Sequence, residues 1–283
     1  MSRAVIERRS VLVDGVPTSY LSAGDGPVVL MLHGTYWSRV WLPVLTDVAA
    51  AGLRPVAVDL PGCGRSSGEL TLETATVPHL AEWTTRFLTA LGVHGPVNVA
   101  GHDIGGALAQ HLLATQPGGV EVRALALVNA VTYDSWPVPT VARYRDPAVV
   151  AATSAQDLVN ARRKSIMAGL ARQATEEELA DYLSPWAEPR VARSWMALAG
   201  AAHDDYTLKL VPALRRSPVP KLLVWGEDDP FQRITYAERF AAEIPRSRLV
   251  RVPKAGHIPM ENDPAAVAQA LAGFFKEEGS TSV

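Results

Sequence analysis

Residues 97–106 read VNVAGHDIGG and are the most informative stretch of the chain. The first four residues are mostly apolar and predict a buried strand, and the residues from Ile104 onward predict a helix. Gly101 and Gly105 each stand two positions from Asp103. This spacing is typical of a sharp turn from strand to helix, which leaves no room for side chains at those positions. The stretch therefore predicts a tight turn that exposes the Asp103 carboxylate at the head of a helix, whose N-terminal dipole favours the anion.

Strand-like and helix-like segments alternate on both sides of this turn. Asp14 and Gly15 separate two strand-like runs and predict an N-terminal hairpin. Short apolar runs predict further strands at about residues 28–32, 55–58, 97–100, 124–128, 221–225 and 248–252. Periodic segments predict helices at about residues 41–51, 76–91, 104–115, 235–243 and 264–276. The alternation predicts an α/β protein with a mostly parallel, eight-stranded sheet flanked by helices.

The alternation stops after the sixth predicted strand. Residues 132–211 instead indicate helices joined by loops rich in Pro, Trp and Tyr, and the Thr175–Glu178 stretch is a capping box that opens one of these helices. We expect residues 1–131 and 212–283 to form the core domain. Residues 132–211 are then expected to form a helical cap, or lid, over Asp103.

Composition and charge exclude several classes of protein. The chain has 283 residues with 27 Lys and Arg against 29 Asp and Glu, which lacks the basic excess of a nucleic-acid binder. Its single cysteine, Cys63, excludes an internal disulfide framework and a multi-cysteine metal site. No run approaches the roughly 18 apolar residues of a membrane helix, and residues 1–10 carry four charges, unlike a secretory signal. We expect a cytoplasmic protein with no membrane or nucleic-acid partner and no metal or other cofactor.

Four further motifs accompany the turn at Asp103. Residues 33–35 read HGT, residues 59–66 read DLPGCGRS, residues 222–230 read LLVWGEDDP and residues 255–261 read AGHIPME. Together and in this order, the five motifs resemble those of the α/β-hydrolase fold family, in which the turn is the nucleophile elbow. The resemblance covers nearly all of the predicted core. Serine is the commonest residue at the elbow of this family, and this chain has aspartate there.

The resemblance implies a catalytic role for each motif. Asp103 takes the position of the nucleophile and His257 that of the catalytic histidine. Asp229 stands three residues after Gly226, at the family position of the acid that orients the histidine, and Asp228 is the alternative. Some relatives carry this acid at the end of the sixth strand, where this chain has Asn129.

The family's oxyanion hole implies two further positions. The backbone N–H groups of Thr35 and Ile104 are expected to form it, with no role for their side chains.

An aspartate nucleophile implies a particular reaction. A carboxylate is already ionised and can displace a leaving group from a saturated carbon, which gives an ester between the substrate and Asp103. His257, held by Asp229, then activates a water that attacks the ester carbonyl. The expected partners are therefore a small apolar organic substrate and water, and the sequence leaves a homodimer open.

The pattern resembles two branches of the family, the epoxide hydrolases and the haloalkane or haloacid dehalogenases. Haloalkane dehalogenases commonly carry Trp at the position of Ile104 and, in many, Asn at that of Thr35, and fluoroacetate dehalogenases commonly carry Arg at that of Ile104. In this chain, neither Ile104 nor Thr35 has a side chain that binds a halide or a carboxylate in those families. We therefore expect an epoxide hydrolase that forms a diol, with a dehalogenase as the alternative. A further hydrolase or lyase, or a non-catalytic binding protein of the same fold, is the second alternative.

The leaving group requires a donor from the pocket. An epoxide oxygen needs an acid, so we expect Tyr144 or Tyr182 to point its hydroxyl at Asp103, with Tyr133 and Tyr206 as weaker candidates. Residues 194–197 read SWMA where epoxide hydrolases often have Asn-Trp-Tyr-Arg, so one proton-donating tyrosine is missing. Indole N–H groups aimed at Asp103 would favour a halide instead. The further candidates at the leaving group or substrate are Trp136, Trp186, Trp195, His33 and Tyr36.

Three other features have simpler interpretations. Residues 162–164 read RRK and are expected to form a solvated helix face. Residues 203–205 read HDD, and a single histidine with adjacent acids lacks a metal-ligand set. No motif supports Cys63 as a nucleophile.

Overall fold

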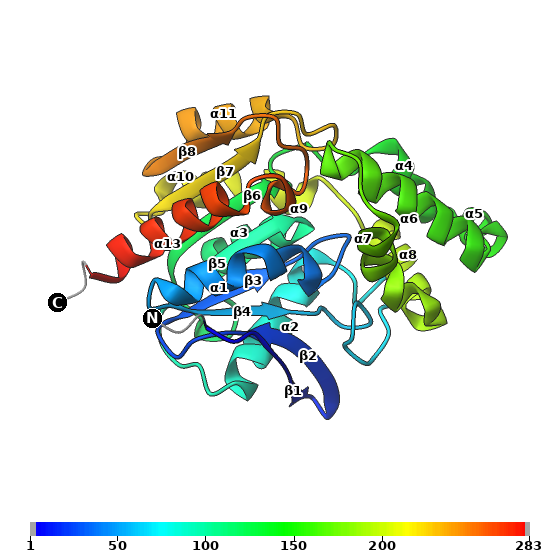
Figure 1. Cartoon of the computed structure of the whole chain (residues 1–283), viewed down its shortest axis with the longest axis horizontal. Helices are drawn as coiled ribbons and strands as arrows, with labels where there is room; N and C mark the ends of the chain where they lie inside the picture. The colour runs from blue at the N-terminus through cyan, green and yellow to red at the C-terminus, as the bar shows by residue number, and fades with distance from the viewer. Residues whose placement is uncertain (1–3, 281–283) are drawn as a thin grey trace.

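The computed structural model describes residues 4–280 and contains one eight-stranded sheet (Figure 1). The strands are β1 (Glu7–Val13), β2 (Val16–Ser22), β3 (Val28–Leu32), β4 (Arg54–Val58), β5 (Val97–Asp103), β6 (Val122–Ala130), β7 (Lys221–Gly226) and β8 (Ser247–Val252). Their order across the sheet is β1-β2-β4-β3-β5-β6-β7-β8. β1 pairs antiparallel with β2 and β2 with β4, and every other pair is parallel. The predicted α/β fold is confirmed.

Helices cover both faces of the sheet because the central strands are apolar on both sides. The helices of the core are α1 (Leu42–Ala50), α2 (Val77–Ala90), α3 (Ile104–Thr115), α11 (Ile234–Glu243), α12 (Pro259–Asn262) and α13 (Pro264–Ser280). In β3, Val29 and Met31 pack with α1 and α13, whereas Leu30 and Leu32 pack with α2, α3 and α11. This two-residue alternation places β5, and Asp103 at its end, in the middle of a fully buried layer.

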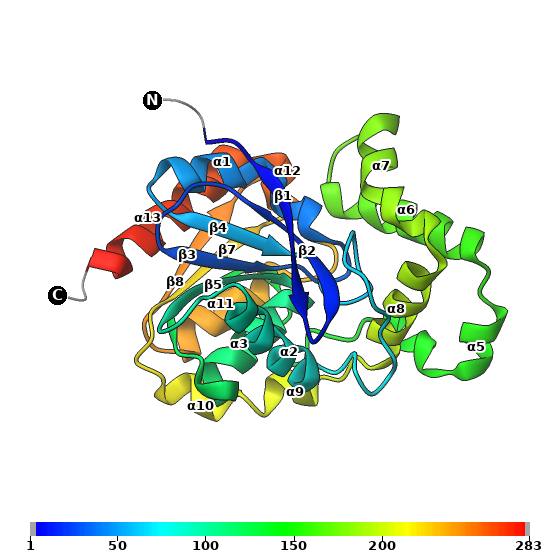
Figure 2. The same cartoon turned by 90° about the horizontal axis from the view of Figure 1, so that it is seen from below.

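The helical insertion lies between β6 and β7. It consists of α4 (Pro139–Ala142), α5 (Pro147–Ala152), α6 (Ala155–Leu170), α7 (Glu176–Leu183), α8 (Pro189–Gly200), α9 (Asp205–Leu208), α10 (Val211–Arg216) and the 3-10 turns Arg143–Arg145 and Ser184–Ala187. Helix α7 begins with the predicted capping box. Figures 1 and 2 show α4–α8 together at the side of the molecule toward which the parallel strands point.

Two short helices lie at the end of the insertion. Helix α9 packs against α3 of the core, as α10 does. The helix before them, α8, ends at Gly200. The boundary between cap and core at residue 211 stays a prediction.

The cap is tied directly to the loop that carries His257. The carbonyl of Gly169, near the end of α6, accepts a hydrogen bond from the Ile258 N–H at 3.1 Å. The Asn262 amide donates to the carbonyl of Leu170 at 2.6 Å. A Cβ on Gly256 would lie 2.5 Å from the Gly169 oxygen, so only glycine allows this approach. These contacts fix the position of α6 relative to the histidine loop.

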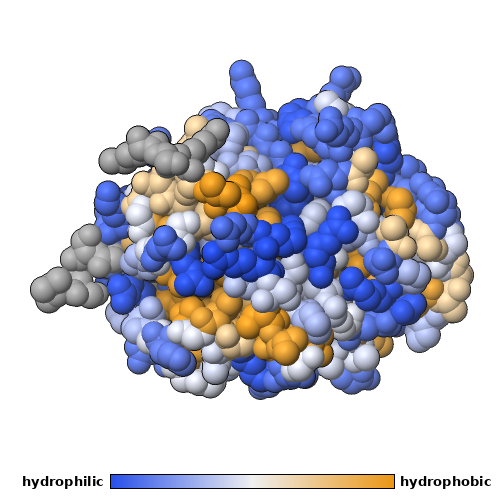
Figure 3. All heavy atoms as spheres, turned by 60° about the horizontal axis from the view of Figure 1, so that its bottom comes forward, coloured by the Kyte–Doolittle hydropathy of each residue, from blue (hydrophilic) through white to orange (hydrophobic). Residues whose placement is uncertain are grey.

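Few large apolar side chains are exposed among the residues that the structure describes. They are Val5, Leu12, Val16, Leu72, Met167 and Leu208. On the face shown in Figure 3, hydrophobic side chains form separate patches between hydrophilic ones, which is ordinary for a protein surface. Within residues 4–280, no helix combines the length and the hydrophobicity that crossing a bilayer requires.

Candidate active site

Asp103 occupies a strained turn between β5 and α3. Its backbone has φ 54° and ψ −124°, a conformation that side-chain-bearing residues rarely adopt, and α3 begins at the next residue. A Cβ on Gly101 would lie 2.3 Å from the Gly105 oxygen, and one on Gly105 would lie 2.2 Å from the Leu32 oxygen. Both glycines are therefore required by close backbone packing, as the sequence predicts.

One oxygen of the Asp103 carboxylate is held by Thr35. Oδ2 accepts the Thr35 N–H at 2.9 Å and the Thr35 hydroxyl at 2.8 Å. A Cβ on Gly34 would lie 2.5 Å from both Oδ2 and the backbone nitrogen of Ile104, so only glycine fits beside the carboxylate. That the Ile104 N–H contributes to the oxyanion hole stays a prediction. The expectation that the Thr35 side chain has no role is wrong, because its hydroxyl is a second donor.

The structure brings His257 to Asp229. The two are joined by a hydrogen bond of 2.8 Å between Nδ1 and Oδ2. Asp229 is buried, whereas Asp228 is exposed. Oδ1 of Asp229 accepts the N–H groups of Phe231 at 2.7 Å and Gln232 at 3.0 Å. These bonds satisfy the carboxylate in its ionised form and fix the orientation of the imidazole.

Asn129 supports this pair and was not expected to do so. It stands at the end of β6, where some relatives carry the acid, and its amide donates to Asp229 Oδ2 at 2.7 Å. Its oxygen accepts the Gly226 N–H at 2.9 Å. Its position at the end of the sixth strand was the only sequence signal for this role.

The three ionisable groups influence one another strongly. His257 Nε2 lies 3.9 Å from Asp103 Oδ1, which is close for two charges but too long for a hydrogen bond. Burial opposes charge on both residues, yet His257 and the Thr35 N–H lower the pKa of Asp103 well below its usual value. Asp229 and Asp103 likewise raise the pKa of His257, against the effect of burial. Asp103 is thus a carboxylate with one oxygen, Oδ1, left free to react.

We expect Asp229→Asn to slow the step that depends on His257 by about 100-fold or more, because the imidazole loses the carboxylate that orients and charges it. Asp228→Asn is the matched control, since it makes the same change one residue away on an exposed side chain. Single-turnover kinetics of both variants measure the effect. A larger loss of rate in Asp228→Asn than in Asp229→Asn would mean that Asp228 is the acid that orients His257.

Two other buried histidines have structural contacts. His33 Nε2 accepts the Leu60 N–H at 3.0 Å, so its Nδ1 carries the proton and donates to the Gly34 carbonyl at 2.9 Å. His102 Nε2 donates to the carbonyl of His257 at 2.7 Å. Burial and the neighbouring His257 lower the pKa of His102 to about 4, so it is neutral. The structure does not bring His33 into the pocket.

A cavity of about 50 Å³ lies over Asp103. The core contributes Thr35, Tyr36, Phe231, Gln232 and His257 to its wall. The insertion between β6 and β7 contributes Trp136, Val138, Thr140, Val141, Arg162 and Ser165. Cap and core therefore enclose the carboxylate between them.

The structure does not bring the cap tyrosines to this cavity. The Tyr182 hydroxyl donates to Glu261 at 2.8 Å, and the Tyr144 hydroxyl accepts from Arg143 at 2.9 Å. Tyr133 points its hydroxyl toward Glu243 at 3.4 Å, and Tyr206 lines a different hollow, beside α9. The expectation that Tyr144 or Tyr182 faces Asp103 is not met. Tyr36, from the loop after β3, is the tyrosine in the wall.

The candidate tryptophans divide into two groups. Trp136 lines the cavity, and its indole N–H is buried without a hydrogen-bond partner in the described structure. Trp186 and Trp195 pack together in the cap, with ring centroids 6.0 Å apart, and do not line the cavity.

Arg162 is the pocket residue that sequence reasoning missed. It was expected on a solvated helix face, but its exposed fraction is 5% and it lines the cavity. Its neighbour Arg163 is partly exposed and pairs with Glu176, as expected for such a face. The helical period alone does not show which of two adjacent arginines faces inward, because that depends on how α6 packs on the core.

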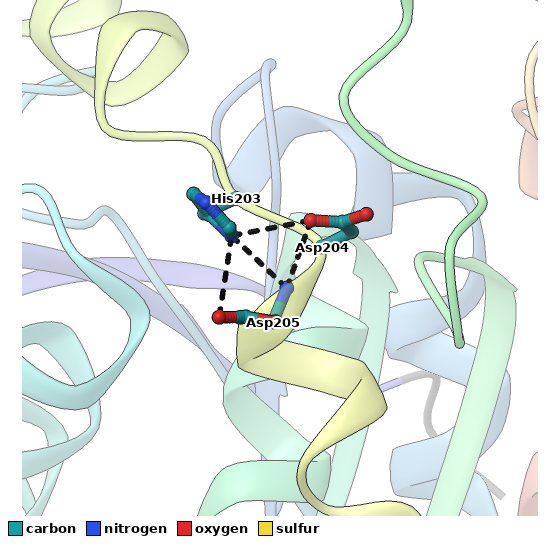
Figure 4. A group of neighbouring side chains, drawn as sticks. All are labelled: His203, Asp204 and Asp205. Carbon is teal, nitrogen blue, oxygen red and sulfur yellow. Dashed lines mark hydrogen bonds and ion pairs between the residues drawn. The ribbon is translucent and has the colours of Figure 1, made fainter.

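Two remaining features add no second site. In Figure 4, His203 and the carboxylates of Asp204 and Asp205 lie together at the start of α9. The Asp205 N–H contacts both His203 Nδ1 and Asp204 Oδ1 at 3.1 Å, so these groups cap the helix. Cys63 is buried, which raises its pKa to about 12 and suppresses the reactive thiolate.

Comparison with known proteins identifies the family. Residues 29–270 match the model of the alpha/beta hydrolase family. The chain belongs to the alpha/beta hydrolase family. It is 31% identical to a haloalkane dehalogenase of Bradyrhizobium diazoefficiens, over 97% of its own length and 96% of the relative's. A haloalkane dehalogenase of Mesorhizobium japonicum is 28% identical, over 92% and 88% of the two lengths.

A structure and a partial match complete the comparison. The crystal structure of the haloalkane dehalogenase DbeA from Bradyrhizobium elkani superposes with a TM-score of 0.81 at 25% identity, over 99% of this chain and 100% of that one. Bifunctional epoxide hydrolase 2 of Sus scrofa is 34% identical, but over 41% of this chain and 20% of its own. This member of the alpha/beta hydrolase family is therefore a hydrolase. The two haloalkane dehalogenases that it matches over nearly their full length favour a dehalogenase, the alternative in the sequence analysis, over an epoxide hydrolase.

Proposed function

We propose that the protein is a hydrolytic dehalogenase that converts a small organohalide and water into an alcohol and a halide. The observation that carries the choice of leaving group is the buried indole N–H of Trp136, which lines the cavity without a partner. A halide ion needs N–H donors that keep their protons. The full-length similarity to haloalkane dehalogenases supports the same choice.

The first step is attack by Asp103 on the carbon that carries the halogen. Oδ2 is engaged by the two Thr35 donors, so Oδ1 is the attacking oxygen. The new bond joins Oδ1 to carbon, while the carbon–halogen bond breaks and its electron pair leaves with the halide. The product is an alkyl ester of Asp103, and no proton moves in this step.

The second step is hydrolysis of that ester. Esterification removes the charge of Asp103, which is one of the two charges that raise the pKa of His257. The imidazolium then releases its proton to solvent, and the neutral imidazole can accept a proton from water. His257 takes a proton from water as the water attacks the ester carbonyl. The negative charge develops on Oδ2, where the Thr35 N–H and hydroxyl donate. Collapse releases the alcohol, which takes the proton from His257. The carboxylic acid left on Asp103 then gives its proton to the imidazole, which restores the carboxylate and the imidazolium.

The surroundings of the tyrosine hydroxyls favour dehalogenation over epoxide opening. An epoxide leaves as an alkoxide and requires an acid. Burial raises the pKa of Tyr36 above its usual value, against the opposing effect of Arg162, and this makes its hydroxyl a weaker acid. Tyr144 and Tyr182 are engaged elsewhere.

The direct test is turnover of a mixed panel of organohalides and epoxides, with halide and diol assayed together. The proposal predicts halide release from at least one short bromo- or chloro-compound and no diol. Diol formation without halide release would instead assign the enzyme to the epoxide hydrolases.

We expect Trp136→Phe to slow alkylation about 10- to 100-fold, because a hydrogen bond to a developing anion contributes about 1.5–3 kcal/mol. Hydrolysis of the ester should be nearly unchanged. Pre-steady-state kinetics separate the two steps. Trp83→Phe is the control, since Trp83 lies on α2 outside the cavity. Equal rates of alkylation in wild type and Trp136→Phe would remove Trp136 from the halide site.

A further inference from the structure

Arg162 places a buried positive charge in the wall of the cavity. Its exposed fraction is 5%, and Nη2 donates to the carbonyl of Thr35 at 3.0 Å. Its Nε is buried without a hydrogen-bond partner in the described structure. The guanidinium is therefore rigidly placed and still has unused donors.

No carboxylate of residues 4–280 forms an ion pair with Arg162 within 4 Å. Buried arginines are usually paired with an anion, because an isolated buried charge costs several kcal/mol. Here the guanidinium lies instead over the rings of Trp195, Tyr36 and Trp186, at 4.9, 5.1 and 5.5 Å from the ring centroids. Such contacts stabilise a cation, and the Tyr36 hydroxyl also interacts with the guanidinium, but Nε remains without a hydrogen-bond partner in the described structure. The site thus holds a cation without a directly paired anion. Burial lowers the pKa of Arg162, and the Asp103 carboxylate opposes that effect from a distance.

The cation lies close to the nucleophile. Thr35 bridges them, since its N–H reaches Asp103 Oδ2 at 2.9 Å and its carbonyl accepts from Arg162 Nη2 at 3.0 Å. One residue of backbone spans at most about 3.6 Å, so the carboxylate and the guanidinium lie within roughly 10 Å. A substrate with an anionic group next to the reacting carbon would fit between them.

The cavity sets the size of that substrate. Its volume is about 50 Å³, whereas a cavity of about 150 Å³ is needed for benzene. A guanidinium binds a carboxylate with two parallel hydrogen bonds. A short carboxylate therefore fits this space better than a long one.

We propose that Arg162 binds the carboxylate of a short 2-halocarboxylate, which is the substrate class of this enzyme. The inference rests on the proposed dehalogenation. Asp103 displaces the halide from the carbon next to the carboxylate, and hydrolysis of the ester releases a 2-hydroxycarboxylate. The arginine comes from the cap and not from the position after the nucleophile, which is Ile104.

The experiment compares chloroacetate with chloroacetamide, which have the same size and leaving group but differ in charge. We expect wild type to prefer chloroacetate about 100-fold in kcat/KM, and Arg162→Gln to reduce this ratio to near one. Arg162→Lys should retain part of the preference, since it keeps the charge but loses the bidentate geometry. Arg163→Gln, at the adjacent and partly exposed arginine, should retain all of it.

Two kinetic results would overturn the inference while leaving dehalogenation intact. One is equal turnover of the two substrates by wild type. The other is an equal fall in kcat/KM for chloroacetate and chloroacetamide in Arg162→Gln. That result would mean that Arg162 binds the halide or supports the pocket.

A binding measurement tests Arg162 even if no organohalide is turned over. Asp103→Ala removes the nucleophile, and calorimetry then measures binding of chloroacetate and chloroacetamide without reaction. We expect chloroacetate to bind and the amide to bind at least 10-fold more weakly. The double variant Asp103→Ala/Arg162→Gln should lose this difference. Failure of Asp103→Ala to bind chloroacetate would contradict the inference, whereas binding without any turnover in wild type would contradict only the proposed function.

Discussion

Asp103→Ala is expected to lower turnover of every substrate by about 10⁴-fold or more, because removal of a covalent nucleophile eliminates the first step. The fold should be retained. The turn is built by close backbone contacts of Gly101 and Gly105, which the substitution does not change. Steady-state kinetics and circular dichroism of the purified variant measure both effects.

Asp228→Asn serves as the control for this experiment, since it removes a carboxylate charge from an exposed side chain in the neighbouring loop. Its turnover should equal that of wild type. If Asp103→Ala retained more than a few per cent of the wild-type rate, the ester mechanism would be wrong. A direct attack by water, with Asp103 as a base or a counter-charge, would then be the better account.

His257→Gln is expected to trap the ester on Asp103. Alkylation needs only the carboxylate, whereas hydrolysis needs a base that the glutamine cannot supply. Intact-protein mass spectrometry after mixing with substrate should therefore show the mass of the substrate without its halogen, and peptide mapping should place it on Asp103. Halide release should stop after about one equivalent.

The double variant Asp103→Ala/His257→Gln should show no added mass, which excludes alkylation of other side chains. A His257→Gln preparation that releases halide over many turnovers would contradict the assignment of His257 to the second step. An adduct on another residue would contradict the assignment of Asp103 to the first.

The core and its catalytic turn are predictable because local patterns determine them. Continuous apolar runs identify strands that are buried on both faces, and the glycines around Asp103 reflect backbone contacts that no other residue tolerates. Asp229 could be located by counting from Gly226, since the strand ends at that glycine and the turn after it is short. The burial of Asp229 and the exposure of Asp228 agree with this count.

The cap is less predictable because its side chains depend on how short helices pack against the core. Arg162 and Arg163 are adjacent in the sequence and have opposite environments. Tyr182 and Tyr144 point toward Glu261 and Arg143, and no local pattern indicates either partner. The end of the cap is also hard to predict, because α9 continues the helical pattern while it packs against α3 of the core.

Two contributions at the site itself also depend on tertiary structure. The Thr35 hydroxyl reaches Asp103, and the Asn129 amide reaches Asp229. Both pairs are brought together by the pairing of strands that are far apart in the sequence. Family patterns identify these positions, but the direction in which a small polar side chain points becomes visible only in the folded structure.

The covalent ester on Asp103 is tested most directly by a single turnover in water enriched in oxygen-18, with enzyme in excess over a reactive organohalide such as bromoacetate. In the proposed mechanism, the oxygen of the first alcohol comes from the Asp103 carboxylate, and water attacks the ester carbonyl. The account therefore predicts unlabelled alcohol and one oxygen-18 atom in the peptide that contains Asp103. Labelled alcohol and an unlabelled Asp103 peptide would contradict it, because water would then have attacked the substrate directly.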